Sequence, residues 1–231
     1  MTTARASDRR RHDRGPDAAI EAEIHAEGMV VAGLDEVGRG AWAGPVTVGA
    51  AILDLAAVPA GLRDSKQLRP ERRQVLDRSL RAGAEVATGE VAHTELDRVG
   101  LAAALRLAAA RAVAALPRRP DVVLIDGSVD LLDGAGYRTR LLVGGDDRSC
   151  SIAAASIVAK VHRDAWMIDQ DPAHRPYGFA ANKGYPSPQH RAALAEHGPC
   201  DLHRRSWQPI RDLLAPRQLD LDGLERATAP S

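Results

Sequence analysis

The sequence predicts an α/β layered domain with a helical C-terminal extension. Short apolar, partly β-branched runs near residues 30 and 122 are typical of buried strands. A long Ala- and Leu-rich stretch between them indicates a helix, and the segments after about residue 170 contain only helical patterns and loops. Strands that alternate with helices early in the chain predict helices packed on a sheet. At 231 residues, the chain is long enough for one sizeable domain.

The individual elements follow from apolar runs, helix-opening prolines and glycine-rich turns. The first two strands are separated by a short turn, so we expect a hairpin. Thr94 and Asp97 are candidate N-caps before the long helix, which Pro117 ends. In chain order, the predicted elements are strands over 29–34 and 44–53, a loop over 59–69, a helix over 70–81, a strand over 84–91, a helix over 99–116, strands over 121–127 and 137–143, a helix over 151–168, a loop over 177–187, and helices over 188–196 and 208–214.

The ends of the chain lack this patterning. Residues 1–28 are polar and Arg-rich, and we expect a flexible tail there, with 18–27 as a possible short helix. We expect one folded domain over 29–222, which includes the C-terminal helices from about 170, and a flexible tail over 223–231.

Four acids stand at or just after predicted strand ends: Asp35, Glu36, Asp126 and Asp146. Several carboxylates that converge on two cations about 4 Å apart are the requirement of two-metal phosphodiester chemistry. Oxygen ligands suit Mg²⁺ or Mn²⁺. A single acid at a strand end is more often a solvated turn residue, so the prediction depends on the set. Neighbouring residues of a strand face opposite sides, so Asp35 and Glu36 can share a site only if the strand ends or bends between them.

A glycine-rich turn, Gly38-Arg39-Gly40, follows the first acid pair. Backbone N–H groups that glycine leaves accessible, together with a guanidinium, can bind a phosphate. No Gly-Lys-Ser/Thr follows and no helix is predicted there, so the turn is not a nucleotide-triphosphate loop.

Lysine is rare in this chain, because all but three of its 31 basic residues are Arg. The three are Lys66, Lys160 and Lys183, and Lys160 lies four residues after Ser156, on the same face of a predicted helix. Lys183 precedes Tyr185 in a segment that also holds the only Phe of the chain, Phe179. Aromatic side chains next to a base suit stacking on a sugar or nucleobase. We expect Phe179 to point inward and Tyr185 to be presented.

Composition limits the class of protein. The net charge is zero, which argues mildly against a protein that coats DNA passively. No segment is apolar enough to span a bilayer and no secretory signal opens the chain, so we expect no membrane association and a cytoplasmic location. Cys150 and Cys200 match no metal or redox spacing, so we expect free thiols.

The motifs together resemble ribonuclease HII, the prokaryotic type 2 ribonuclease H, over about residues 29–214. The resemblance rests on six segments in this order: Asp-Glu-Val-Gly-Arg-Gly at 35–40, Asp-Ser-Lys at 64–66, Ile-Asp-Gly at 125–127, Gly-Asp at 145–146, Ala-Ala-Ser-Ile-Val-Ala-Lys-Val-His-Arg-Asp at 154–164, and Asn-Lys-Gly-Tyr-Pro at 182–186 with His190 following.

This resemblance implies a ribonuclease H-like fold, a mixed central sheet flanked by helices. It also implies endonucleolytic hydrolysis of the RNA strand in RNA–DNA hybrids and incision 5′ to a single ribonucleotide in duplex DNA. It makes the four acids the ligands of two Mn²⁺ or Mg²⁺ ions. Either Asp146 or the adjacent Asp147 matches the fourth ligand. It assigns the turn to the 2′-hydroxyl and its flanking phosphate, and Tyr185 to the neighbouring deoxyribose. Lys66, Ser156, Lys160 and Lys183 match positions close to the substrate backbone.

Alternatives are a ribonuclease HIII-like hybrid nuclease, a resolvase of the same superfold, and a non-catalytic module that binds RNA–DNA hybrids. The last would not need all four acids. We expect a monomer, and the sequence assigns no surface for contact with a sliding clamp.

Overall fold

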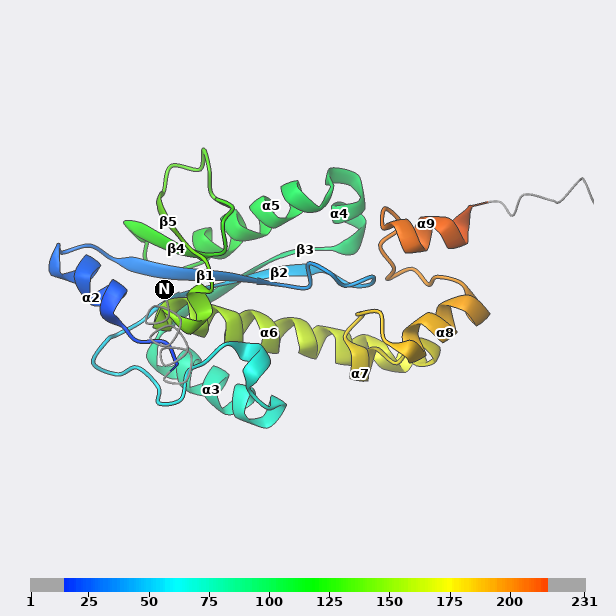
Figure 1. Cartoon of the computed structure of the whole chain (residues 1–231), viewed down its shortest axis with the longest axis horizontal. Coiled ribbons are helices and arrows are strands. Elements are labelled where there is room, and N and C mark those ends of the chain that lie inside the picture. Colours follow the sequence, from blue (N-terminus) through cyan, green and yellow to red (C-terminus); the bar gives the residue numbers. More distant parts are fainter. Residues whose placement is uncertain (1–14, 216–231) are drawn as a thin grey trace, which may run out of the picture.

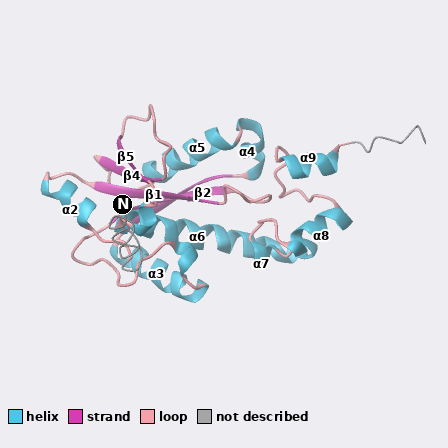
Figure 2. Cartoon of the chain, in the orientation of Figure 1, coloured by secondary structure: helices cyan, strands magenta, loops and turns pink. Residues whose placement is uncertain are grey.

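A computed structural model describes residues 15–215, and its core is a five-stranded sheet covered by helices on both faces (Figures 1 and 2). Along the chain, the helices and strands are α2 (Ala19–Ala26), β1 (Val31–Val37), β2 (Val46–Ile52), α3 (Pro70–Gly83), β3 (Glu85–Val91), α4 (His93–Val99), α5 (Leu101–Ala114), β4 (Val122–Asp126), β5 (Arg138–Leu142), α6 (Cys150–Gln170), α7 (Phe179–Asn182), α8 (Pro188–His197) and α9 (Gln208–Leu214). Single 3₁₀ turns are η1 (Ser65–Gln67), η2 (Gly145–Asp147), η3 (Asp171–Ala173) and η4 (Arg175–Tyr177).

The strand order is β3-β2-β1-β4-β5. β1, β2 and β3 are antiparallel neighbours, which confirms the predicted hairpin, whereas β4 and β5 continue the sheet parallel to β1. The long helix α6 packs on one face together with α3, and α5 covers the other face (Figure 1). The predicted fold class is therefore confirmed.

Small residues allow α6 to lie close to the sheet. A Cβ atom built on Gly33 of β1 would lie 2.1 Å from the backbone carbon of Ser151. On Gly49 of β2 it would lie 2.2 Å from the carbonyl oxygen of Ala155. Glycine is required at both positions because backbone atoms of the helix occupy the space that a side chain would take. This close approach fixes the start of α6 relative to β1.

The helices α7, α8 and α9 lie beyond one end of the sheet, as the predicted C-terminal extension requires (Figure 2). Their core contains Phe179, which is fully buried as expected, stacked on Tyr177 at 5.6 Å between ring centroids. The predicted loop over 177–187 contains one helical turn, α7. None of the helices among residues 15–215 is long and apolar enough to cross a bilayer.

The structure corrects the prediction of a flexible tail over 1–28 for its described part, residues 15–28. Within the described part of that tail, α2 forms the predicted short helix and packs on the domain through Ile24. Glu21 is fully buried, and its Oε1 accepts hydrogen bonds from the Ser149 hydroxyl at 2.6 Å and from the Ser151 N–H at 2.9 Å. A carboxylate at the N-terminus of α6 is favourable. The sequence pattern missed this contact because it is made by one side chain rather than by an apolar stripe.

The predictions for residues 1–14 and 216–231 lie outside the described residues. The candidate N-caps are wrong. α4 begins at His93, so Thr94 and Asp97 lie inside it, and the Asp97 carboxylate accepts hydrogen bonds from the backbone N–H groups of Arg205 and Ser206 instead.

Candidate active site

The four predicted acids gather where β1 extends beyond its parallel neighbour. Asp35 and Glu36 lie near the end of β1, Asp126 is the last residue of β4, and Asp146 belongs to the turn η2 that follows β5. The pairing of β1 with β4 ends just before Asp35. We call the side of Asp35 and Glu36 that β4 leaves unpaired the open flank of the acid pair. Because parallel strands end at the same edge of a sheet, Asp126 reaches this open flank.

The neighbours Asp35 and Glu36 remain within one strand, since β1 continues to Val37 and both residues pair with β2. The strand therefore does not end between them. Asp35 is buried on the α6 side, with Ser156 beside its carboxylate. Glu36 is more exposed and lies 3.5 Å from the Arg39 guanidinium. The negative charge of Asp126 acts on both carboxylates, because the open flank lies beside both.

Asp126 and Asp146 are linked by the turn between them. The Gly145 N–H donates to Asp126 Oδ1 at 2.7 Å, which holds η2 against the end of β4. Asp146 is buried, whereas Asp147 is half-buried and its Oδ1 accepts a hydrogen bond from the Gln67 side chain at 3.1 Å. Burial beside the other acids favours Asp146 over Asp147 as a member of the site.

The four carboxylates lie close together with too little positive charge nearby to balance their repulsion. Burial, with repulsion from Asp126 and Glu36, raises the pKa of Asp35 to about 7, although the Ser156 hydrogen bond and Lys66 oppose the rise. Burial and the charge of Asp126 raise the pKa of Asp146 to about 6. Burial would lower the pKa of Lys66, but the surrounding carboxylates outweigh it and raise that pKa.

A donor set of carboxylate oxygens fits a hard divalent cation, and a cation would relieve the repulsion that raises these pKa values. Among the described residues, no three of these acids bring oxygens within 4.8 Å of one another. In this arrangement they do not form the ligand shell of one ion. A pair of ions about 4 Å apart needs ligands over a wider space than a single ion does.

The raised pKa values predict that stability depends on pH when divalent cations are removed. The folded protein holds protons on Asp35 and Asp146 that the unfolded chain releases above its pKa of 3.8. This contribution to stability is complete below about pH 4 and is lost as the pH rises through 6 and 7. Urea unfolding in EDTA should give a free energy of unfolding lower by roughly 2–4 kcal/mol at pH 8 than at pH 5.

Two comparisons check this pH effect. Divalent cation should restore more stability at pH 8 than at pH 5, because it competes with protons for the carboxylates. The Asp35→Asn variant should show a smaller pH slope than wild type. A wild-type stability that rises from pH 5 to pH 8 in EDTA would contradict the assignment.

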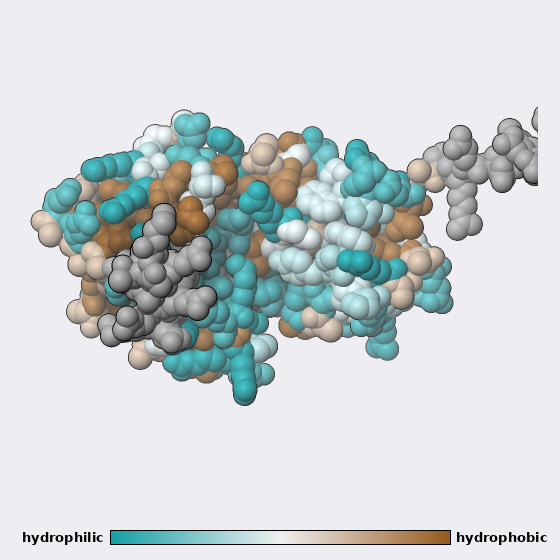
Figure 3. Space-filling model, viewed as in Figure 1, coloured by the Kyte–Doolittle hydropathy of each residue, from teal (hydrophilic) through white to brown (hydrophobic). Residues whose placement is uncertain are grey.

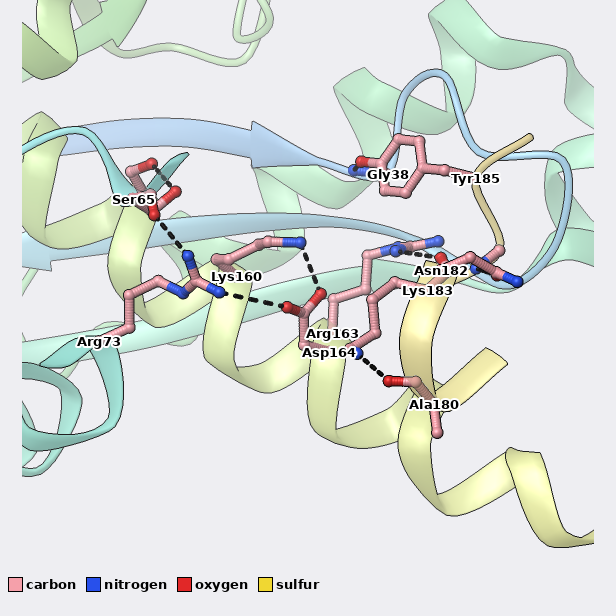
Figure 4. A network of polar contacts seen from close by, with 12 residues as sticks. Gly38, Ser65, Arg73, Lys160, Arg163, Asp164, Ala180, Asn182, Lys183 and Tyr185 are labelled. Atoms are coloured by element: carbon pink, nitrogen blue, oxygen red, sulfur yellow. Dashed lines mark hydrogen bonds and ion pairs between the residues drawn. The ribbon is translucent and has the colours of Figure 1, made fainter. Parts of the chain in front are cut away.

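A second group of predicted residues lies around the glycine-rich turn. The Gly38 N–H donates to the Tyr185 hydroxyl at 3.2 Å, although the two residues are 147 positions apart (Figure 4). Gly38 has φ +88°, and a Cβ there would lie 2.3 Å from Nε of Arg163, so only glycine fits. Arg39 and Gly40 are exposed. The structure thus brings the turn and the tyrosine together, next to Glu36.

Two buried arginines that the sequence analysis did not assign hold this arrangement. Arg163 and Arg204 are both fully buried. Because nearly every basic residue of the chain is Arg, their identity gave no signal in the sequence. Arg163 donates to the carbonyls of Ala43, Pro45 and Lys183, and Arg204 donates to those of Arg39, Gly44 and Pro45. They therefore fix the segment after the turn to the loop that carries Tyr185.

A cleft of about 370 Å³ lies between α3, α6 and α7, beside Tyr185. Figure 3 shows the surface hollowed between α3 and the C-terminal helices, with hydrophilic residues at its border. Lys160 lies in its wall, with Nζ 2.7 Å from Asp164 Oδ1 and 5.8 Å from the centre of the Tyr185 ring (Figure 4). Lys183 also lines it and donates to the Ala180 carbonyl. Asp164 is thus the ion-pair partner of Lys160.

The predicted substrate residues are therefore divided between two places. Lys160, Lys183 and Tyr185 line the cleft, whereas Lys66 and Ser156 lie with the acids. The Ser156 hydroxyl lies 2.9 Å from the Ser65 hydroxyl, which connects α6 to the Asp-Ser-Lys segment.

Comparison with known proteins agrees with this geometry. A family model described as ribonuclease HII matches residues 32–210, which contain the acids, the turn and the cleft. The chain belongs to the ribonuclease HII family. A curated ribonuclease HII of Streptomyces avermitilis is 51% identical to it over 195 residues, which cover 83% of each chain.

Solved structures show the same fold. Ribonuclease H2 from Pyrococcus horikoshii is similar with a TM-score of 0.65 and 26% identity, over 80% of this chain and 97% of that one. A ribonuclease HII from Archaeoglobus fulgidus, solved as a complex with PCNA, gives a TM-score of 0.68 and 25% identity, over 84% of this chain and all of that one. The protein is thus a type 2 ribonuclease H, a hydrolase of a family that uses divalent metal. The ribonuclease HIII alternative is set aside.

Proposed function

We propose that this ribonuclease HII hydrolyses the RNA strand of RNA–DNA hybrids and incises 5′ to single ribonucleotides in duplex DNA, and that it leaves 3′-hydroxyl and 5′-phosphate ends. The observation that carries the proposal is the placement of four acids beside the pair formed by Gly38 and Tyr185. The four acids can hold the metal ions for hydrolysis, and the pair formed by Gly38 and Tyr185 can select the phosphodiester to be cut.

We assign Asp35, Glu36, Asp126 and Asp146 to two divalent ions, Mn²⁺ or Mg²⁺. Such ions lower the pKa of an attacking water and stabilise a leaving 3′-oxygen. The chain itself supplies rigidity, because Asp35 and Asp126 lie on paired strands and the Gly145 N–H fixes Asp126. Ser156 lies beside the Asp35 carboxylate, and we assign Lys66, whose charge acts on the acids, to the substrate backbone.

Recognition of the ribonucleotide is assigned to the turn. The 2′-hydroxyl distinguishes RNA from DNA, and the backbone of Gly38, Arg39 and Gly40 can contact it without contacting a base. Tyr185, held by its hydroxyl against Gly38, would stack on the adjacent deoxyribose. Lys160 and Lys183 in the cleft supply local positive charge for phosphates, which is consistent with a net charge of zero for the whole chain. Cutting should not depend on base sequence.

The test is incision of a DNA duplex that carries one ribonucleotide, compared with cleavage of a long RNA–DNA hybrid. Tyr185→Ala should lower incision of the single-ribonucleotide duplex by roughly 10–100-fold, because stacking on an aromatic side chain contributes about 1–3 kcal/mol. The long hybrid should lose much less, since it offers many alternative sites. Tyr185→Phe keeps the ring but lacks the hydroxyl that accepts the Gly38 N–H, so it should lose less than Tyr185→Ala on the single-ribonucleotide duplex.

Equal losses on the two substrates would rule out a role of Tyr185 in sensing the junction. No cleavage of either substrate by the wild-type protein with Mg²⁺ or Mn²⁺ would rule out the function itself.

The proposal also covers the oligomeric state, the location and a partner of the enzyme. We take the active form to be a monomer in the cytoplasm. A sliding clamp is included as a partner because the similar Archaeoglobus fulgidus protein was solved with PCNA.

A further inference from the structure

A cluster of soft and borderline metal ligands lies in the C-terminal helical part, apart from the four acids. It consists of His174, just before η4, and of Cys200 and Asp201, between α8 and α9. One ligand atom of each lies within 4.8 Å of the other two. The cluster therefore joins two segments of the chain that are separated by the substrate loop and α8.

The hydrogen bonds of His174 are those of a metal-ligating histidine with a proton in place of the metal. Its Nδ1 lies 2.9 Å from the Gln170 carbonyl oxygen and its Nε2 lies 2.9 Å from Asp201 Oδ1. Both partners accept only, so both ring nitrogens carry hydrogen. A cation that replaces the Nε2 proton leaves the Nδ1–H bond to the carbonyl unchanged, and such a bond is the usual support of a histidine ligand.

A second histidine, His203, accepts the backbone N–H of Cys200 and holds this cysteine in place. The Tyr185 carbonyl can only accept, so His190 carries its proton on Nδ1, 2.9 Å away. Nε2 of His190 then accepts from Nε2–H of His203 at 2.9 Å. This leaves Nδ1 of His203 as an acceptor, and it lies 3.0 Å from the Cys200 N–H and 3.1 Å from Cys200 Sγ. The Tyr185 carbonyl at one end and the Cys200 N–H at the other require the same tautomers of His190 and His203.

We propose that His174, Cys200 and Asp201 bind a Zn²⁺-type divalent cation and leave its fourth position open. A set of one imidazole nitrogen, one sulfur and one carboxylate oxygen suits Zn²⁺, whereas the carboxylate group at the end of β1 suits Mg²⁺ or Mn²⁺. Binding would release two protons to solvent, one from Cys200 Sγ and one from His174 Nε2. Burial raises the pKa of the Cys200 thiol to about 11, so the thiol keeps its proton until a cation displaces it.

The surroundings of the site are rigid on one side and open on the other. His190 and His203 are buried, and His203 packs against the Tyr177 ring at 4.9 Å between centroids. Asp201 is exposed and Cys200 is half-buried, which gives a cation access. Because His190 connects His203 to the Tyr185 carbonyl, a bound ion would stiffen the loop that carries Tyr185.

Cobalt spectroscopy of the full-length protein tests the site without any measurement of activity. Co²⁺ is added after saturation with Mg²⁺, which occupies the oxygen-ligand site. We expect one equivalent of Co²⁺ to produce a thiolate-to-cobalt charge-transfer band and tetrahedral d–d bands. Cys200→Ser should abolish the charge-transfer band, while Cys150→Ser, which changes the other free cysteine, should retain it.

Zinc should also raise the melting temperature, by roughly 5–10 °C at a concentration 100-fold above its dissociation constant. The rise should be lost in His174→Ala and kept in His197→Ala, which alters a histidine at the end of α8 outside the cluster. Absence of the charge-transfer band in wild type, or its persistence in a folded Cys200→Ser variant, would overturn the proposal. Neither result depends on nuclease activity.

Discussion

The Asp35→Asn variant is expected to cleave RNA–DNA hybrids and ribonucleotide-containing DNA roughly a thousandfold more slowly than wild type. Asp35 is the most deeply placed acid of the site, between β1 and α6. Metal catalysis contributes several kcal/mol, and each 1.4 kcal/mol corresponds to a factor of ten in rate. The amide cannot replace the negative charge that the two cations of the proposed site would require. The rate constant under saturating Mg²⁺ or Mn²⁺ is the measurement.

The same substitution should stabilise the protein when no divalent cation is present. At pH 8 the wild-type carboxylate is ionised and repelled by Asp126 and Glu36. The neutral amide removes this repulsion, so the free energy of unfolding in EDTA should rise by roughly 1–3 kcal/mol. Loss of activity with a gain of stability separates a metal ligand from a residue that is needed for folding.

Asp133→Asn is a matched control, because this acid is exposed and paired only loosely with Arg106, at 3.8 Å. It should leave both rate and stability unchanged. Undiminished cleavage by Asp35→Asn would remove Asp35 from the site.

The Gly33→Ala variant is expected to lose roughly 3 kcal/mol or more of stability, a melting temperature lower by roughly 6–12 °C. The added methyl group would lie 2.1–2.4 Å from backbone atoms of Ser151 and Ile152. Backbone atoms of a packed helix cannot rotate away as a flexible side chain can. Either α6 must move from the sheet or β1 must bend. Thermal unfolding with and without Mg²⁺ measures the cost.

This substitution should also weaken metal binding, because the start of α6 directly follows the turn that carries Asp146. Gly83→Ala, at the end of α3, is the control. No atom lies within 4 Å of a Cβ there, and alanine should be neutral or stabilise the helix by up to about 1 kcal/mol. A Gly33→Ala protein as stable as the control would show that α6 does not lie as close to β1 as described.

Much of the fold could be predicted because its signals are local. The apolar run at 122–126, the proline that opens α3 and the composition of α6 each depend on residues close in sequence. Errors occurred where a distant partner decided the structure. Asp97 is an example, because it resembles an N-cap in the sequence but receives N–H groups from the segment before α9.

The residues of the candidate site also fall into those that local sequence predicts and those that distant partners decide. Its acids could be predicted because few arrangements other than a metal site place so many carboxylates at strand ends. Arg163 and Arg204 could not be predicted, since their role arises only when Pro45 accepts hydrogen bonds from both. Glu21 was missed for the same reason, because its partners begin a helix 128 residues further along the chain.

The sequence by itself determined the order of the five strands and the long helices and the family, and it singled out the acids, because periodicity and motif spacing are properties of the chain. Only the tertiary structure decided which acids are buried, how Asp35 and Glu36 both come under the charge of Asp126, and that Tyr185 meets Gly38. The physical reason is that burial, repulsion between charges and hydrogen bonds depend on distances in space. Residues far apart in sequence acquire such distances only when the sheet and α6 have packed.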